Sequence, residues 1–141
     1  MSGILRVTSG ALQGYLDKIV TLTGANGKLN VYTSPMPAVG GDSIGAATLL
    51  GTVTLASTLG TVAWNSGASA YQLTFNTSTP DLIADADGNA YWARITTSGG
   101  TWIADLDITA TGGGGYITMP SVAVYAGGTI TLSSAVISLP V

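Results

Sequence analysis

Paired aspartates are the acid–base option that this sequence offers, because it contains no histidine, no cysteine and no glutamate. Asp105 and Asp107 lie two residues apart in an alternating segment, so both carboxylates are predicted on one face of a strand. Two carboxylates placed this way could share a proton or hold a cation. An aspartic dyad also needs a cleft and a partner loop, so the pattern favours a solvated outer face opposite Trp102, Leu106 and Ile108.

Other catalytic arrangements are excluded by composition. Without histidine or cysteine there can be no Ser-His-Asp or Cys-His arrangement and no histidine-based zinc site. The lack of cysteine also removes disulfides and thiolate chemistry. We therefore expect a non-enzymatic protein with no catalytic residue, no metal ligand and no cofactor.

Two short motifs resemble ligand-binding loops. Asp85 and Asp87 stand at alternate positions, as at the start of a calcium loop. That loop needs a bidentate acid further on, which the next residues do not supply, so a hairpin turn at Asp87-Gly88 is favoured. The glycine run 112–115 would need a following lysine and serine or threonine to cradle a phosphate. Tyr116 follows instead, so we expect a flexible connector.

Four aromatic residues could form a platform on which sugars stack, but most of them lie in phase with core positions, so packing is the favoured interpretation. They are Trp64, Tyr71, Trp92 and Trp102.

Charge is scarce, at 8% of residues with a net charge of −3, against roughly 25% in ordinary domains. Four scattered basic residues disfavour nucleic-acid binding, which needs clustered lysine and arginine. A hydrophobic fraction of 46% argues against disorder. A free monomer usually carries more charge, so we expect part of the surface to be covered in the working state.

Two long uncharged stretches, 43–80 and 108–141, do not predict a membrane protein. Glycine, serine and threonine interrupt their apolar runs, so neither reaches the ~20 mostly apolar residues of a spanning helix. The first ten residues lack a basic region followed by an apolar run, so we expect no secretory signal.

One helix is predicted near the start, at about 9–20, with Ser9 as its cap. Leu12, Tyr15, Leu16 and Ile19 recur at helical spacing and form its apolar stripe.

Beyond the helix the period becomes two, and glycine-rich turns separate short segments with threonine-rich outer faces. This pattern predicts a single mainly β domain over 1–141, an antiparallel β-sandwich or jelly roll of about eight strands with one short N-terminal helix. The alternating segments lie near 28–31, 52–55, 71–76, 91–96, 102–108, 122–124 and 130–132.

The order of several motifs resembles a family of small tailed-phage virion proteins, which act as head decoration or minor capsid proteins. The motifs are ALQGYLDKI at 11–19, GKLNVYTSPMPA at 27–38, TLLGTVTLA at 48–56, YWARITTSGGTWIADLDI at 91–108 and AGGTITLSSAVISLP at 126–140.

This resemblance implies a structural virion protein without an enzymatic site. The first expectation is a capsid decoration (cement) protein, made in the host cytoplasm, that binds the outer surface of the phage head and bridges major capsid subunits. A tail or neck component is the second, and a carbohydrate-binding β-sandwich adhesion module is the third.

The expected partners are the major capsid protein and further copies of the chain, with no nucleic acid and no membrane. We expect a homotrimer, because icosahedral shells offer three-fold and quasi-three-fold sites. The last strand, 128–139, has no charge to guard its edge, so it is either a contact strand or an interior strand of the sandwich.

Overall fold

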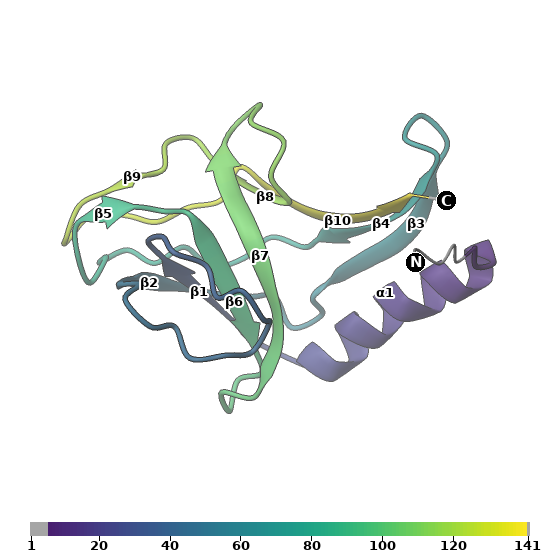
Figure 1. Ribbon diagram of the computed structural model, residues 1–141, viewed down its shortest axis with the longest axis horizontal. Helices are drawn as coiled ribbons and strands as arrows, with labels where there is room; N and C mark the ends of the chain where they lie inside the picture. Colours follow the sequence, from purple (N-terminus) through teal and green to yellow (C-terminus); the bar gives the residue numbers. More distant parts are fainter. Residues whose placement is uncertain (1–5, 141) are drawn as a thin grey trace.

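The computed structural model describes residues 6–140, which are mainly β with one helix, α1 (Ser9–Thr23) (Figure 1). Ten strands follow α1, and eight of them form one curled sheet in the order β2-β1-β6-β7-β8-β10-β4-β3. The mainly β fold with one N-terminal helix is therefore confirmed. The strands are β1 (Lys28–Tyr32), β2 (Leu49–Thr54), β3 (Gly60–Asn65), β4 (Ala70–Phe75), β5 (Gly88–Asn89), β6 (Trp92–Thr96), β7 (Trp102–Ala110), β8 (Ile117–Met119), β9 (Ala123–Val124) and β10 (Ser134–Pro140).

Helix α1 packs against β3 and β4, and its buried stripe leaves out Tyr15, one of the four residues that the sequence predicted. Leu16 is fully buried and Leu12 is half-buried, whereas Tyr15 is 61% exposed. Neighbouring helical residues are rotated by about 100°, so centring Leu16 on the sheet turns Tyr15 outward. The helix cap is Thr8 rather than Ser9, because the Thr8 hydroxyl accepts from the backbone N–H of Ala11 at 3.2 Å. In the described part of the chain, no helix is long and apolar enough to cross a membrane.

The sheet is mixed rather than wholly antiparallel, because β7 and β8 run parallel. Parallel neighbours usually need a crossover of a dozen or more residues, but here only the segment 111–116 joins them. Gly112 and Gly114 adopt φ +87°, which lets the chain reverse tightly. The backbone N–H of Gly115 then donates to Thr109 Oγ1 at 3.0 Å. The glycine run is thus a turn packed against β7, where the sequence predicted a flexible connector.

Strand β10 is an interior strand between β8 and β4. Of the two interpretations of the segment 128–139, the interior strand is therefore correct for β10, and the open contact edge is wrong. The missing charge that suggested an open edge instead reflects burial between two neighbouring strands.

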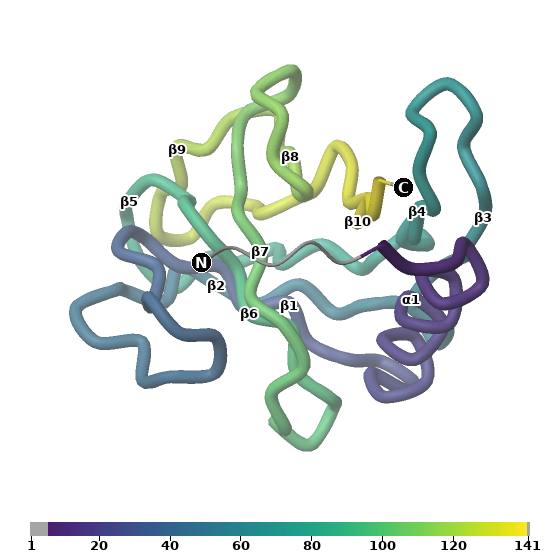
Figure 2. The backbone as a smooth tube through the Cα atoms, turned by 45° about the vertical axis from the view of Figure 1, so that its right-hand side comes forward, coloured from purple at the N-terminus to yellow at the C-terminus, as the bar shows by residue number. Residues whose placement is uncertain are grey.

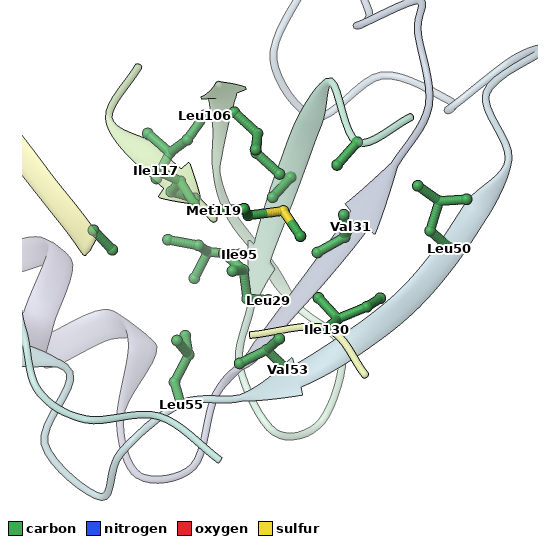
Figure 3. Close-up of a cluster of buried hydrophobic side chains, with 14 of the residues drawn as sticks. Leu29, Val31, Leu50, Val53, Leu55, Ile95, Leu106, Ile117, Met119 and Ile130 are labelled. Atoms are coloured by element: carbon green, nitrogen blue, oxygen red, sulfur yellow. The ribbon is translucent and has the colours of Figure 1, made fainter. Parts of the chain in front are cut away.

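The main core fills one face of the curled sheet, and Figure 3 shows its centre. Side chains from the helix, from the strands and from the segment before β10 meet there. Burying each large aliphatic side chain contributes about 1.5–3 kcal/mol, so this cluster dominates folding. Its fully buried members include Leu16, Leu29, Val31, Leu50, Val53, Leu73, Ile95, Ile117 and Ile130.

The opposite face of β1 and β6 is also buried, beneath the loop 33–48. Tyr32 and Trp92 are cross-strand neighbours whose rings stack 4.6 Å apart, and Ala47 of the loop joins them. Trp92 is fully buried. Because both faces of these strands are covered, alternation along β6 does not separate buried from exposed positions.

Candidate functional site

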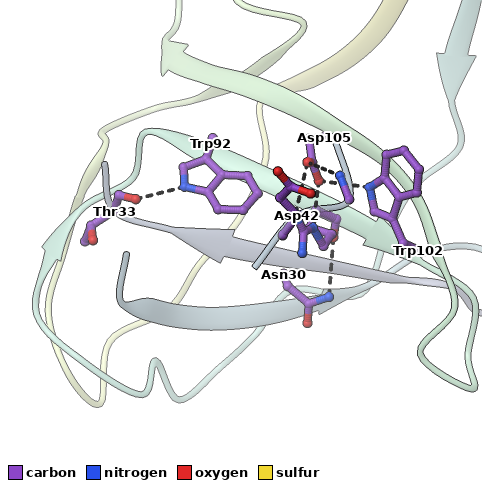
Figure 4. Close-up of polar contacts among 8 residues, drawn as sticks. Asn30, Thr33, Asp42, Trp92, Trp102 and Asp105 are labelled. Carbon is purple, nitrogen blue, oxygen red and sulfur yellow. Dashed lines mark hydrogen bonds and ion pairs between the residues drawn. The ribbon is translucent and has the colours of Figure 1, made fainter. Parts of the chain in front are cut away.

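A row of polar side chains crosses four strands on the face covered by the loop 33–48, and Figure 4 shows part of it. Register aligns the row from β2 to β7 in the order Thr52, Asn30, Arg94 and Asp105. Asn30 accepts from Thr52 Oγ1 at 3.0 Å and donates to the backbone oxygen of Arg94 at 3.3 Å. Arg94 Nε and Nη2 donate to the two carboxylate oxygens of Asp105 at 2.8 and 3.1 Å. This bidentate geometry is the strongest form of a carboxylate pair.

Asp105 is saturated by hydrogen-bond donors and closed off from solvent. Besides Arg94, it accepts from Trp102 Nε1 at 3.1 Å and from the backbone N–H of Gly41 at 3.2 Å. The Asp105 side chain is 3% exposed and that of Arg94 is 12% exposed. Burial raises the pKa of Asp105, but the hydrogen bonds from Arg94, Gly41 and Trp102 outweigh burial and bring the pKa below its ordinary value. The carboxylate is held ionised with its lone pairs occupied, which suits structure rather than proton transfer.

The Arg94–Asp105 pair fastens the loop 33–48 to the sheet. Arg94 Nη2 donates to the backbone oxygen of Asp42 at 2.7 Å, next to the Gly41 contact. At the start of the loop, Trp92 Nε1 donates to the backbone oxygen of Thr33 at 2.9 Å. The hydrogen bond to Asp105 raises the pKa of Arg94, so the pair stays charged. The loop is therefore tied down at two points from one strand, β6.

Asp105 and Asp107, the candidate acid–base pair, each have separate partners. Asp107 is exposed, and its Oδ1 accepts from the backbone N–H of Tyr116 at 3.0 Å. The predicted solvated outer face is therefore correct for Asp107 and wrong for Asp105, because the loop 33–48 covers the latter. Sequence reasoning missed this cover, since Arg94 and Asp105 are 11 residues apart and their pairing depends on the β6–β7 register.

The Asp85–Asp87 motif does not form the predicted hairpin turn. Gly88, which follows it, begins β5, and β5 pairs with β9 far along the chain. Asp87 Oδ1 accepts from the backbone N–H of Ala126 at 2.7 Å. Within residues 6–140, no group of three or more aspartate, glutamate, histidine or cysteine side chains could hold a metal ion.

Four of the seven aspartates share one role, which is to accept hydrogen bonds from backbone amides of loops and strand ends. Asp81 accepts from Thr52 at 2.9 Å and from Ile83 at 3.0 Å. The sequence signal for this role is the use of aspartate alone among the acids, since a short carboxylate reaches nearby amides. The four are Asp81, Asp87, Asp105 and Asp107.

The aromatic residues considered as a sugar platform do not assemble into one. Trp92 is buried beneath the loop 33–48. Trp64 and Tyr71 meet edge to face on β3 and β4, with ring centroids 5.3 Å apart. Trp102 lies on β7 and is 44% exposed.

Two adjoining shallow grooves follow β7 and carry exposed aromatic side chains. Tyr15, Met36 and Trp102 line the first. Tyr116 lines the second, which shares Met36 and Asp105 with the first. The helix, the loop 33–48 and β7 thus present adjoining grooves of mixed polar and apolar lining, held in place by the Arg94–Asp105 pair.

Comparison of the chain with protein-family models, with curated proteins and with solved structures finds no match. The function proposed below therefore rests on this chain's own surface and on its motifs.

Proposed function

We propose that this chain is a structural virion protein, a capsid decoration (cement) protein that binds the outer surface of a tailed-phage head and bridges major capsid subunits. The observation that carries the proposal is the apolar surface. Among residues 6–140, eleven large hydrophobic side chains are 40–71% exposed, as many as the charged residues in the whole sequence. Where such side chains lie together, as Tyr15 and Trp102 do beside β7, they form a surface that another protein can cover. These residues are Val7, Tyr15, Leu22, Val39, Trp64, Leu82, Ile83, Tyr91, Trp102, Tyr116 and Tyr125.

The use of charge supports the same proposal. Arg94 and Asp105 neutralise each other beneath a loop, which leaves nine of the eleven charged residues. Few charges are left to keep an isolated copy soluble or to steer it to a charged ligand. Contacts that are weak one by one become strong when a shell repeats them, so a small apolar protein can hold a lattice through avidity. On such a shell the chain would sit as a homotrimer at three-fold positions.

Reconstruction of purified particles of the phage that encodes this chain tests the proposal. Density for the chain over the outer face of the shell, in a fixed ratio to the major capsid protein, is the expected result. A ring of copies at one vertex would assign the chain to the neck, and density along the tail would assign it to the tail. Absence of the chain from purified particles would end the virion proposal altogether.

One observation favours carbohydrate binding as a second candidate. Trp102 is fixed by its hydrogen bond to Asp105, and a Cβ on Gly40 or Gly41 would lie 3.0 and 2.9 Å from its ring. One part of the indole therefore rests on glycine backbone while 44% of the residue stays exposed beside Tyr15. A fixed, open aromatic ring is what a sugar ring stacks on. Glycan binding that Trp102→Ala abolishes and Trp64→Ala retains would support this candidate.

A further inference from the structure

One end of the eight-stranded sheet is covered by the chain itself. On the outer edge of β2, the backbone N–H of Thr54 donates to the backbone oxygen of Thr79 at 3.2 Å, and the N–H of Thr79 donates back to the oxygen of Thr54 at 2.8 Å. Asp81 accepts from the backbone N–H of Thr52, and Asp85 donates its backbone N–H to Leu50 at 2.7 Å. The segment 79–85 therefore satisfies this edge as an additional strand would.

The other end of the sheet, β3, is open. Strand β3 pairs with β4 alone and forms the right-hand margin of the molecule in Figure 2. The backbone oxygen of Leu59 accepts from the backbone N–H of Asn76 at 2.9 Å, so the backbone groups of Leu59 point toward the strand that contains β4. Because the direction alternates along a strand, Thr61 and Ala63 also bond toward β4, and the backbone groups of Gly60, Val62 and Trp64 point away from the sheet.

Two of these three residues are accessible, because Val62 is half-buried and Trp64 is 46% exposed, whereas Gly60 is buried. On the outer side of β3, no hydrogen bond within residues 6–140 reaches the backbone of Gly60, Val62 or Trp64. The strand sequence GTVAWN contains no charge and no proline, the usual guards of an exposed edge. Helix α1 contacts both β3 and β4, so it covers a face of this hairpin. The chemistry that fits such an edge is another extended backbone.

We propose that the β3 edge pairs with the β3 edge of a second copy of this chain, antiparallel and across a two-fold axis. A contact across a two-fold axis places a surface of one copy against the same surface of the other, so one open edge is enough for it. An uncharged strand can lie against itself without placing like charges opposite each other. The same contact would extend the sheet from one copy into the next.

The outward groups fix the register of this contact. Three residues point outward at equal spacing, so the symmetric register places Val62 opposite Val62 of the second copy. Gly60 then lies opposite Trp64 of the second copy, at the two ends of the contact. Gly60 is required by β4 in any case, because a Cβ there would collide with the backbone oxygen of Thr74.

This contact is independent of the proposed function, since it follows from the edge alone. A homotrimer needs two different contact surfaces on each copy, which a single open edge cannot supply. A trimer on a shell would use other surfaces, and β3 would join neighbouring trimers across the two-fold axes between them.

Light scattering on the full chain tests self-association. The wild type is expected to have the mass of two chains, falling toward one on dilution. Thr61→Lys with Ala63→Lys places lysines opposite lysines in the proposed register, so this variant is expected to have the mass of one chain. The matched control is Thr74→Lys with Gln72→Lys, which adds the same charge to the register partners of those residues, one strand inward. The control is expected to remain a dimer.

Cysteine trapping tests the register, because the sequence has no cysteine of its own. In the proposed contact the two copies of residue 62 have Cα atoms about 5.5 Å apart, within disulfide range. The two copies of residue 64 are separated by roughly 14 Å along the strand. Val62→Cys is therefore expected to cross-link on mild oxidation, and Trp64→Cys is not. A wild type that stays monomeric at every concentration, a dimer that survives the edge lysines, or equal cross-linking at both positions would overturn the proposal.

Discussion

Replacing Asp105 with alanine removes the acceptor of four hydrogen bonds at once. Two come from Arg94, one from Trp102 and one from the backbone of Gly41. The Arg94 guanidinium then remains in a site where it is 12% exposed, without its counter-charge. The loop 33–48 loses its Gly41 contact with β7 at the same time.

The expected cost is about 3–4 kcal/mol of unfolding free energy. Removing one partner of a buried ion pair costs about 3–5 kcal/mol, because the other charge is left uncompensated. Arg94 keeps its hydrogen bond to the backbone oxygen of Asp42, so the lower end of that range applies. The released donors of Trp102 and Gly41 lie near the surface, where water can replace the carboxylate, so they add about 0.5 kcal/mol each.

Urea unfolding followed by tryptophan fluorescence measures this cost. With a slope of about 2 kcal/mol per molar urea, the midpoint is expected to fall by about 1.5–2 M at unchanged slope. Asp107→Ala is the matched control on the same strand, since it removes one exposed backbone contact and is expected to cost about 1 kcal/mol or less. A loss below about 1 kcal/mol for Asp105→Ala would place the pair among solvent-exposed ion pairs and refute the reasoning.

Three further outcomes follow from the same structure. Leu16→Ala is expected to cost about 2–5 kcal/mol because Leu16 is fully buried, and Leu12→Ala clearly less, as thermal unfolding would measure. Gly113→Ala is expected to cost about 1–3 kcal/mol, because a Cβ there would lie 2.7 Å from a threonine side chain of β7, whereas Gly99→Ala in an open turn should change little. In acid, the unfolded chain binds a proton at Asp105 more readily than the folded chain, because hydrogen bonds that outweigh burial lower the pKa of Asp105 in the folded state. The difference in unfolding free energy between wild type and Asp105→Ala should therefore persist above about pH 4 and shrink as the pH falls through the folded pKa. A difference that stays constant on acidification would contradict this.

Local features of the fold could be predicted from the sequence because they depend on neighbouring residues. The three- and four-residue spacing around Leu16 predicted the helix, and the two-residue alternation around Val53 and Leu106 predicted strands. The cap was displaced by one residue, since Thr8 and Ser9 are both able to cap and the backbone decides between them.

The candidate site could be predicted only in its composition. The absence of histidine, cysteine and glutamate limits the acids to aspartate whatever the fold. That Asp105 is buried and Asp107 exposed was not visible, because alternation places both on one face. The loop 33–48, which closes over one and not the other, is held there by Arg94 from a neighbouring strand.

The sequence by itself therefore determined the mainly β class, the helix and the scarcity of charge, because periodicity and composition act over a few residues or over the whole chain. Only the tertiary structure decided which edge of the sheet is open. The uncharged segments that contain β3 and β10 look alike in sequence, but β10 lies between two strands while β3 has one neighbour. Strand order depends on pairing between residues such as Leu73 and Ile137, far apart in the chain, and no local pattern records it.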